Sequence, residues 1–396
     1  MTRAQVDHRK FGLAPMEGVS DLPFRLWMSL ASSPEFCSTP FLRVTSTFPK
    51  NKIPRAFAPE LSELRPYISY KLNPQLMAAR VEDFLRVAPE ILEHCESIDL
   101  NCGCPSPNAV GSSAGSSLLS TPETFYNFVS EITDNLGPNK LSVKMRTGFT
   151  SHQEFFPLID SIKELPLRRL GVHGRTRHQR YDGLNRWQLI HQAAKSLPYP
   201  VVGSGDILSY ENLEKYADCI EPLESVLIGR GALRNPWIFR EIRSKENVTL
   251  SAGGLMAAIT CLALLYYLAI TDENALIEFV KKGDFLSPCH ESEEQWMLMV
   301  EKLSQACFKE MVDIKDIDIP PFVLGRVKML WNYLRSSLPQ QFFQPKVLRS
   351  RSLRSLLEGI ESICGENRIP LSHNPNHDWI YTSRKKPPAE TDASFS

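Results

Sequence analysis

The stretch that decides the fold is YPVVGSGDILSYENLEKYADCIEPLESVLIGRG, Tyr199–Gly231. It contains two short, β-rich apolar runs, Tyr199–Ser204 and Ser225–Gly229, and each leads into a turn that contains glycine. Strands that alternate with helical segments along a chain pair in parallel. The stretch therefore indicates part of a parallel sheet whose strands end in glycine-rich loops.

Six earlier runs have the same character, and most of the intervals between runs show helical periodicity, as in Leu76–Leu92 and Pro122–Leu136. The six runs are Phe11–Pro15, Phe36–Val44, Pro66–Leu72, Ser97–Asn101, Leu141–Arg146 and Arg168–Gly174. Eight strand–helix units in about 230 residues predict an α/β fold of the (β/α)8 TIM-barrel type. A doubly wound open sheet is the alternative, but Ala14–Ser20, after the first run, lacks the GxGxxG turn expected of it.

The pattern changes after Phe239, where helical segments follow one another without β-rich runs between them. These segments are Leu255–Ile270, Glu293–Val312 and Pro321–Leu334. The first is the longest apolar run, with about 16 residues, whereas a membrane-spanning helix needs roughly 20. We therefore expect a buried helix and no membrane association.

These patterns predict three parts of the chain. We expect a catalytic barrel in residues 1–245, a smaller all-helical domain in residues 246–375, and a disordered tail in residues 376–396, which is polar and contains proline. No internal repeat is evident. We expect the protein to be a monomer.

Composition restricts the compartment and the partners. The chain has 45 basic and 45 acidic residues among 396, so any affinity for nucleic acid must come from a local patch. Nine cysteines, an odd number at irregular spacing, together with a polar N-terminus, indicate a reducing, cytoplasmic compartment.

Polar residues cluster at the predicted carboxyl ends of the strands, which form the active face of a barrel. They are Met16 with Glu17, Arg43, Asn101 with Cys104, Lys144 with Arg146, His173 with Arg175, Ser204–Asp206 and Gly229–Gly231. The last two groups follow strands seven and eight, where barrels commonly bind a phosphate on backbone amides. The alternative is that these glycines only make tight turns.

Lys144 would point into the mouth of the barrel, where an ammonium group is costly unless it faces an anion. A reduced flavin supplies such an anion, and a lysine near its N1 and C2 carbonyl edge would stabilise the anionic hydroquinone. The alternative is a lysine that extends from the strand end into solvent.

Two cysteines, Cys102 and Cys104, lie one residue apart in DLNCGCPS, Asp99–Ser106. Zinc needs four ligands, and no second pair lies nearby; a disulfide across one glycine would be strained. Cys102 can be an inert buried thiol. Cys104 leads into a loop, where a largely protonated thiol can donate a proton or act as a nucleophile.

A basic stretch lies in residues 326–357, which contain no aspartate or glutamate. Its basic residues are Arg326, Lys328, Arg335, Lys346, Arg349, Arg351 and Arg354. This pattern is typical of a nucleic-acid-binding patch, although a solvated helix face is an alternative. We expect these charges to have no compensating carboxylates.

The chain resembles the flavin-dependent tRNA-dihydrouridine synthases over residues 11–360. Six motifs stand in family order: APMEGVSD (Ala14–Asp21), DLNCGCPS (Asp99–Ser106), VKMRTG (Val143–Gly148), GVHGRTRHQRYDG (Gly171–Gly183), VVGSGDI (Val201–Ile207) and LIGRGALRNPW (Leu227–Trp237). FLRV at Phe41–Val44 and GRVKMLWNYLR at Gly325–Arg335 are most like the bacterial C subfamily, which acts on uridine 16 of the D-loop.

The resemblance implies a barrel that binds FMN, a helical domain that helps to bind tRNA, NADPH as electron donor, and no metal. Hydride would pass from the flavin to uracil C6 while Cys104 protonates C5. The implied FMN-binding residues are Pro15, Met16, Glu17, Lys144, His173, Ser204, Gly205, Asp206, Gly229 and Arg230. The implied substrate-binding residues are Asn101, Tyr181, Arg43, Arg326, Lys328 and Lys346.

The sequence departs from the family pattern in the third strand, where the family has a glutamine that binds flavin. Pro66–Leu72 contains no glutamine, and Gln75 lies several residues later. Lys346 and Ser204 stand where the family has arginine and asparagine. Two other functions remain open: a barrel flavoenzyme acting on a small molecule, or a tRNA-binding homologue with impaired catalysis.

Overall fold

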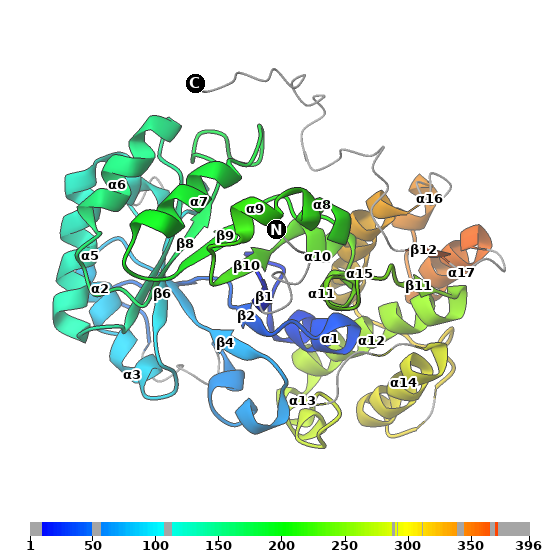
Figure 1. The fold of residues 1–396 in the computed structure, drawn as a ribbon. Coiled ribbons are helices and arrows are strands. Elements are labelled where there is room, and N and C mark those ends of the chain that lie inside the picture. Colours follow the sequence, from blue (N-terminus) through cyan, green and yellow to red (C-terminus); the bar gives the residue numbers. More distant parts are fainter. Residues whose placement is uncertain are drawn as a thin grey trace.

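The strands of the computed structural model form a ten-stranded, all-parallel sheet (Figure 1). The structure describes residues 10–49, 57–106, 113–286, 290, 292–310, 312–338, 344–364 and 369–370. The strands are β1 (Lys10–Leu13), β2 (Phe36–Ser38), β3 (Leu42–Arg43), β4 (Lys71–Asn73), β5 (Gln75–Met77), β6 (Ile98–Cys102), β7 (Leu141–Arg146), β8 (Arg169–His173), β9 (Val201–Ser204) and β10 (Ser225–Ile228). Their order is β3-β5-β6-β7-β8-β9-β10-β1-β2-β4.

The two edge strands of the sheet, β3 and β4, directly continue strands at the opposite edge, β2 and β5, and so the sheet closes into a barrel. β2 pairs with β4, with Phe36 beside Lys71, and β3 pairs with β5, with Leu42 beside Leu76. β4 and β5 are separated only by Pro74, so β2–β3 and β4–β5 each form one interrupted barrel strand. The described residues thus form eight barrel strands, which confirms the predicted (β/α)8 fold.

The third barrel strand lies further along the chain than predicted. The expected run Pro66–Leu72 begins in a 3-10 helix, Arg65–Tyr67, and only its last two residues belong to β4. Between them lies Tyr70, which is buried and whose hydroxyl donates to Glu60 Oε1 at 3.1 Å. The β-prone residues thus serve packing. The strand is instead Lys71–Met77, and Pro74, which has no N–H, divides it. Gln75 is therefore a third-strand residue.

Helices cover the outside of the barrel, as Figure 1 shows for α5, α6 and α7. They are α1 (Leu22–Ser32), α2 (Val81–Leu85), α3 (Ala88–Leu92), α5 (Pro122–Leu136), α6 (Phe155–Ser161), α7 (Trp187–Ser196), α8 (Tyr210–Lys215), α9 (Ala217–Ile220), α10 (Arg230–Arg234) and α11 (Ile238–Ser244). The predicted helix Pro122–Leu136 is found with the same bounds: Thr121 accepts from the N–H of Thr124 at 3.1 Å, and Gly137 follows its end. The helix expected at Leu76–Leu92 begins only at Val81, because Leu76 belongs to β5.

A second group of helices lies beside the barrel (Figure 1). It comprises α12 (Ala252–Thr271), α13 (Glu273–Val280), α14 (Glu293–Phe308), α15 (Pro321–Leu334), α16 (Pro345–Leu348) and α17 (Leu353–Cys364), with a short antiparallel pair, β11 (Thr249–Leu250) and β12 (Ile369–Pro370). α12 packs against α1, α13, α14, α15 and α17. Among the described residues, α12 alone is long and apolar enough for a bilayer span, but 78% of its most apolar window is buried inside the protein.

The two parts share an apolar core. Trp27 of α1, Trp237 before α11 and Trp296 of α14 have ring centroids between 6.1 and 6.5 Å apart. Trp27 Nε1 also donates to Ala258 O of α12 at 2.7 Å. The division at residue 245 stays a prediction, and the expected tail, 376–396, lies outside the described residues.

Candidate functional site

A cavity of about 370 Å³ opens at the carboxyl ends of the barrel strands, within the range of ligand sites. Cys104, in the loop just after β6, and Lys144, on β7, line the same cavity. The other lining residues that the sequence predicted are Pro15, Met16, Glu17, Asn101, His173, Tyr181, Ser204, Gly205, Asp206, Gly229 and Arg230. The closed barrel therefore brings side chains from across more than 200 residues of sequence to one place.

Three predicted substrate-binding residues, Arg43, Arg326 and Lys328, lie outside the cavity lining. Arg43 is an exposed residue of β3, and Arg326 and Lys328 lie on α15. Lys346 lies in α16, and its side chain is outside the described part of the protein. If these residues have a role in binding, it concerns a ligand larger than the cavity.

Among the polar side chains that line the cavity, Gln75 and Tyr333 were not predicted at the site, and Arg146 was expected at the active face without a binding role. The sequence pattern does not identify Gln75, because it predicts the third strand too early in the chain. Its signal in the sequence was Pro74, which marks an interruption within a strand. Tyr333 comes from α15, so the helical part contributes directly to the site.

The loop that carries Cys104 is held by Asn101. Asn101 Oδ1 accepts hydrogen bonds from the N–H groups of Gly103 at 3.1 Å and Cys104 at 2.9 Å. Ser116 Oγ donates to Cys104 O at 2.7 Å. Both thiols are free, but Cys102 is buried, whereas Cys104 is half-buried and faces the cavity. Cys104 is thus positioned for chemistry in the cavity.

The Lys144 ammonium faces the cavity from the barrel interior. Burial lowers its pKa to about 8, opposed by the negative charge of Asp99 and assisted by the positive charge of Arg146. Among the described residues, none accepts a hydrogen bond from Lys144 Nζ. A cationic group of this kind is available to an anionic ligand.

Arg146 joins two loops at the mouth of the cavity. Its Nε donates to Gly103 O at 2.8 Å, beside Cys104, and its Nη1 donates to Thr176 O at 3.0 Å and Arg180 O at 2.5 Å. Thr176 and Arg180 belong to the loop after β8. Arg146 therefore fixes the position of the Cys104 loop relative to the loop after β8.

Tyr181, in the same loop, is an exposed aromatic residue at the mouth. The guanidinium carbon of Arg230 lies 4.7 Å from its ring centroid, and that of Arg146 lies 5.6 Å away. Cation–π contacts of this length restrain the ring without covering it, since 43% of the residue stays accessible. An aromatic surface of this kind suits stacking on a planar base.

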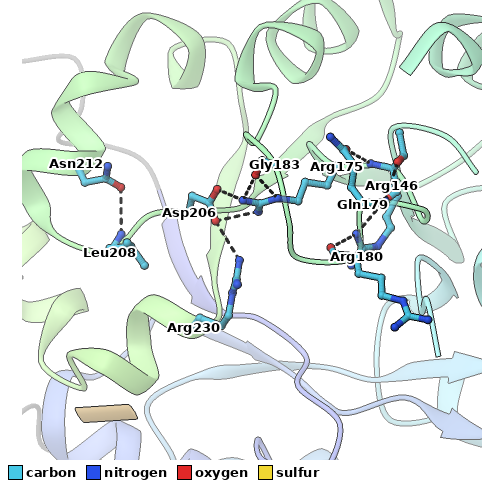
Figure 2. Close-up of polar contacts among 10 residues, drawn as sticks. Arg146, Arg175, Gln179, Arg180, Gly183, Asp206, Leu208, Asn212 and Arg230 are labelled. Atoms are coloured by element: carbon cyan, nitrogen blue, oxygen red, sulfur yellow. Dashed lines mark hydrogen bonds and ion pairs between the residues drawn. The ribbon is translucent and has the colours of Figure 1, made fainter. Parts of the chain in front are cut away.

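Asp206 lies at the centre of an arginine network shown in Figure 2. Arg175 binds both carboxylate oxygens and also donates to Gly183 O at 2.7 Å, while Arg230 donates to Asp206 Oδ1 at 3.1 Å. The carboxylate thus faces two cations, so its direct effect is to hold Arg230 at the cavity. With Arg146 and Lys144 nearby, the cavity has an excess of positive charge.

His173 lines the cavity as a neutral imidazole. Burial lowers its pKa well below the usual value, and the positive charges of Arg146 and Lys144 lower it further. A neutral ring both donates and accepts one hydrogen bond.

Glycines are required where the loops after β9 and β10 meet other backbone. A Cβ on Gly231 would lie 2.0 Å from Ile207 O, and Gly205 has a φ of +128° and would place a Cβ 2.0 Å from Asn185 Oδ1. Only glycine tolerates these contacts and that backbone conformation. The two loops can therefore lie close together beside Arg230.

The basic stretch is partly neutralised, so the expectation that it lacks compensating carboxylates is wrong. Arg326 binds Asp21 Oδ2 at 3.0 Å and also donates to Gly18 O, while Arg354 forms an ion pair with Asp316. These carboxylates lie far away in sequence, and so a local count misses them. Arg349 and Arg351 remain exposed.

Comparison with known proteins identifies relatives of the chain. The model of the dihydrouridine synthase (Dus) family matches residues 12–267. The tRNA-dihydrouridine(16) synthase of Escherichia coli O157:H7 is 32% identical over 238 residues, covering 59% of this chain and 75% of that protein. A tRNA-dihydrouridine(47) synthase [NAD(P)(+)]-like protein of Arabidopsis thaliana is 32% identical over 256 residues, covering 63% of this chain and 36% of that protein.

A distant likeness exists among solved structures. Morphinone reductase matches with a TM-score of 0.42 and 11% identity, covering 61% of this chain and 88% of that chain.

Proposed function

The chain belongs to the dihydrouridine synthase family, and from this premise we propose that it reduces a uridine in the D-loop of tRNA, uridine 16, to 5,6-dihydrouridine. It is a flavin-dependent oxidoreductase with a nicotinamide-type reductant; we propose FMN and NADPH specifically. The observation that supports this most is that Cys104 and Lys144 line one cavity at the carboxyl ends of the strands.

The residues of the cavity fit FMN. Arg230 and the closely packed glycine loops after β9 and β10 would hold its phosphate, with Asp206 orienting Arg230. Lys144, which has no hydrogen-bond acceptor in the described residues, would face the pyrimidine edge of the ring. Pro15, Met16, Glu17, His173, Ser204, Gly205 and Gly229 would complete the site.

When bound and reduced, FMN would supply the hydride for uracil C6. Cys104 would donate its thiol proton to C5, because it is half-buried and its loop is fixed by Asn101. Asn101 and Tyr181 would hold the uracil at the mouth. Because the cavity is recessed, the base must leave the tRNA fold to reach it.

The tRNA body would lie across the mouth and the helical part. We propose that Arg43, Arg326, Lys328 and Lys346 contact it, with residues 246–375 as the tRNA-binding domain and 1–245 as the catalytic domain. Tyr333 supports this arrangement, since α15 carries Arg326 and Lys328 and also reaches the cavity. One helix thereby connects the basic surface to the proposed active site.

Purified protein tests the proposal. We expect a flavin absorption spectrum, NADPH-dependent bleaching, and recovery of the oxidised spectrum under anaerobic conditions when unmodified tRNA is added. A small-molecule reductase would bleach without responding to tRNA, and a tRNA-binding homologue with impaired catalysis would bind tRNA without recovery.

Replacing Lys328 by alanine should weaken tRNA binding while leaving flavin bound. Lys328 Nζ donates to Ser350 O at 3.0 Å, so its charge is held on the surface between α15 and α16. One lost phosphate contact reduces the slope of log K against log salt by about 1. Lys302→Ala is the matched control. It removes a lysine of α14 that forms an ion pair with Asp284. Loss of flavin, or an unchanged salt slope, would contradict the assignment.

A further inference from the structure

A chain of three polar side chains, Asp99, Gln75 and Asn101, runs from the barrel interior along the wall of the cavity to the loop of Cys104. Gln75 Nε2 donates to Asp99 Oδ2 at 2.5 Å, and Gln75 Oε1 accepts from Asn101 Nδ2 at 2.6 Å. Asn101 Oδ1 then accepts from the N–H groups of Gly103 and Cys104. Asp99 Oδ2, Gln75 Oε1 and Asn101 Oδ1 thus each accept a hydrogen bond from the next member of the chain or from the loop.

The strand register explains why these groups meet. Gln75 of β5 and Asp99 of β6 are direct cross-strand partners. Asp99 and Asn101 are two residues apart on one strand, so their side chains point to the same side, here the barrel interior. Asp99 does not line the large cavity; it lines a second one, of about 20 Å³, with Lys144 and Arg169. It therefore has no direct access to the proposed substrate.

The chemistry of the chain gives Asp99 a specific task. An amide group has one accepting and one donating end of similar shape, so Gln75 and Asn101 can each lie in two orientations. Burial raises the pKa of the Asp99 carboxyl, opposed by the hydrogen bond from Gln75 and by the charges of Arg169 and Lys144. Its Oδ2 accepts from Gln75 and thereby draws the Gln75 NH2 group towards itself. Gln75 then presents oxygen to Asn101, which in turn presents oxygen to the loop.

We propose that Asp99 is a positioning residue that sets the polarity of the Gln75–Asn101 amide chain and thereby fixes the loop that carries Cys104. This inference rests on the proposed role of Cys104 as proton donor. The positioning itself is independent of that role, because it concerns the N–H groups of Gly103 and Cys104. A direct readout of these two groups separates the two claims.

The test is hydrogen exchange on the FMN-loaded protein, measured at the amides of Gly103 and Cys104. Asp99→Asn should speed their exchange about tenfold, the factor that corresponds to one lost hydrogen bond. It should also slow the transfer from reduced flavin to tRNA by about tenfold or more, with tRNA affinity unchanged. Unchanged exchange at both amides would overturn the proposal.

A double variant that moves the carboxylate from position 99 to position 75 should restore the slow exchange of the loop amides. In Asp99→Asn combined with Gln75→Glu, the new carboxylate at position 75 accepts from the amide groups at positions 99 and 101. The amide of Asn101 keeps its orientation, so exchange at Gly103 should return to the wild-type rate. No return would contradict the proposal. If Asp99→Asn alone does not fold, the double variant carries the test. It should then fold and show wild-type hydrogen exchange at Gly103.

Glu241→Gln is the matched control, because it alters another buried carboxylate bound to an amide. Glu241 Oε2 accepts from Asn235 Nδ2 at 2.6 Å, and Oε1 accepts from the N–H of Val248 at 2.8 Å. This change should leave exchange at Gly103 and Cys104 unaltered. Equal acceleration in this control would mean that general loosening, and not amide polarity, moves the loop.

Discussion

Cys104→Ala should leave yellow, tRNA-binding protein that cannot complete uridine reduction. The thiol faces the cavity, and Asn101 and Ser116 hold its backbone, so alanine fits without disturbing either contact. A positioned general acid contributes about 10²- to 10⁴-fold, and the variant should lose that factor. Anaerobic stopped-flow measurement of flavin reoxidation by unmodified tRNA gives the rate.

Cys102→Ala is the control for this variant. Cys102 is two residues away, buried, and absent from the cavity lining. It should retain turnover with tRNA. Unchanged turnover in Cys104→Ala would remove that thiol from the mechanism.

Lys144→Met should slow uridine reduction by about 10²-fold, the usual effect of removing one preorganised electrostatic partner. In the free protein the pKa of Lys144 is lowered to about 8, chiefly by burial. The ammonium is therefore present below that pH and lost as the pH rises through it. Because the anionic reduced ring binds the charged form of Lys144 better, wild-type affinity for reduced FMN should fall above pH 8.

The variant should lose this pH dependence, and anaerobic titration of apoprotein with reduced FMN on both sides of pH 8 measures it. His173 does not interfere, because its pKa lies well below the usual value. Lys140→Met, which alters an exposed lysine just before β7, is the matched control and should keep the wild-type profile. A wild-type profile in Lys144→Met would assign the titration to another group.

The barrel was predictable because parallel strands repeat one local pattern. Leu141–Arg146 and Pro122–Leu136 were placed with their observed bounds, since an alternating pattern and a proline at the helix start are local signals. The sequence places the third strand too early because Tyr67 and Tyr70 favour β structure, whereas Tyr67 packs partly buried against the core and Tyr70 is buried against Glu60. Tertiary packing overrode propensity there, and Gln75 was lost from the predicted site as a consequence.

The residues that line the cavity were partly predictable for the same reason. Strand ends converge in any barrel, so Lys144, His173 and Arg230 could be grouped from the sequence. Tyr333 could not be found this way, because it reaches the cavity from a helix outside the repeating units. The pairing of Arg326 with Asp21 also depends on how the helical part packs on the barrel, which no local pattern contains.

The account depends most on the claim that this cavity reduces a uridine of tRNA. Mass mapping of tRNA from cells that lack the protein tests it directly. We predict that uridine 16 loses the mass of two hydrogens in those cells and regains it with the wild-type protein, but not with Cys104→Ala. Full dihydrouridine at that position and at every other modified site in the deletion cells would contradict it.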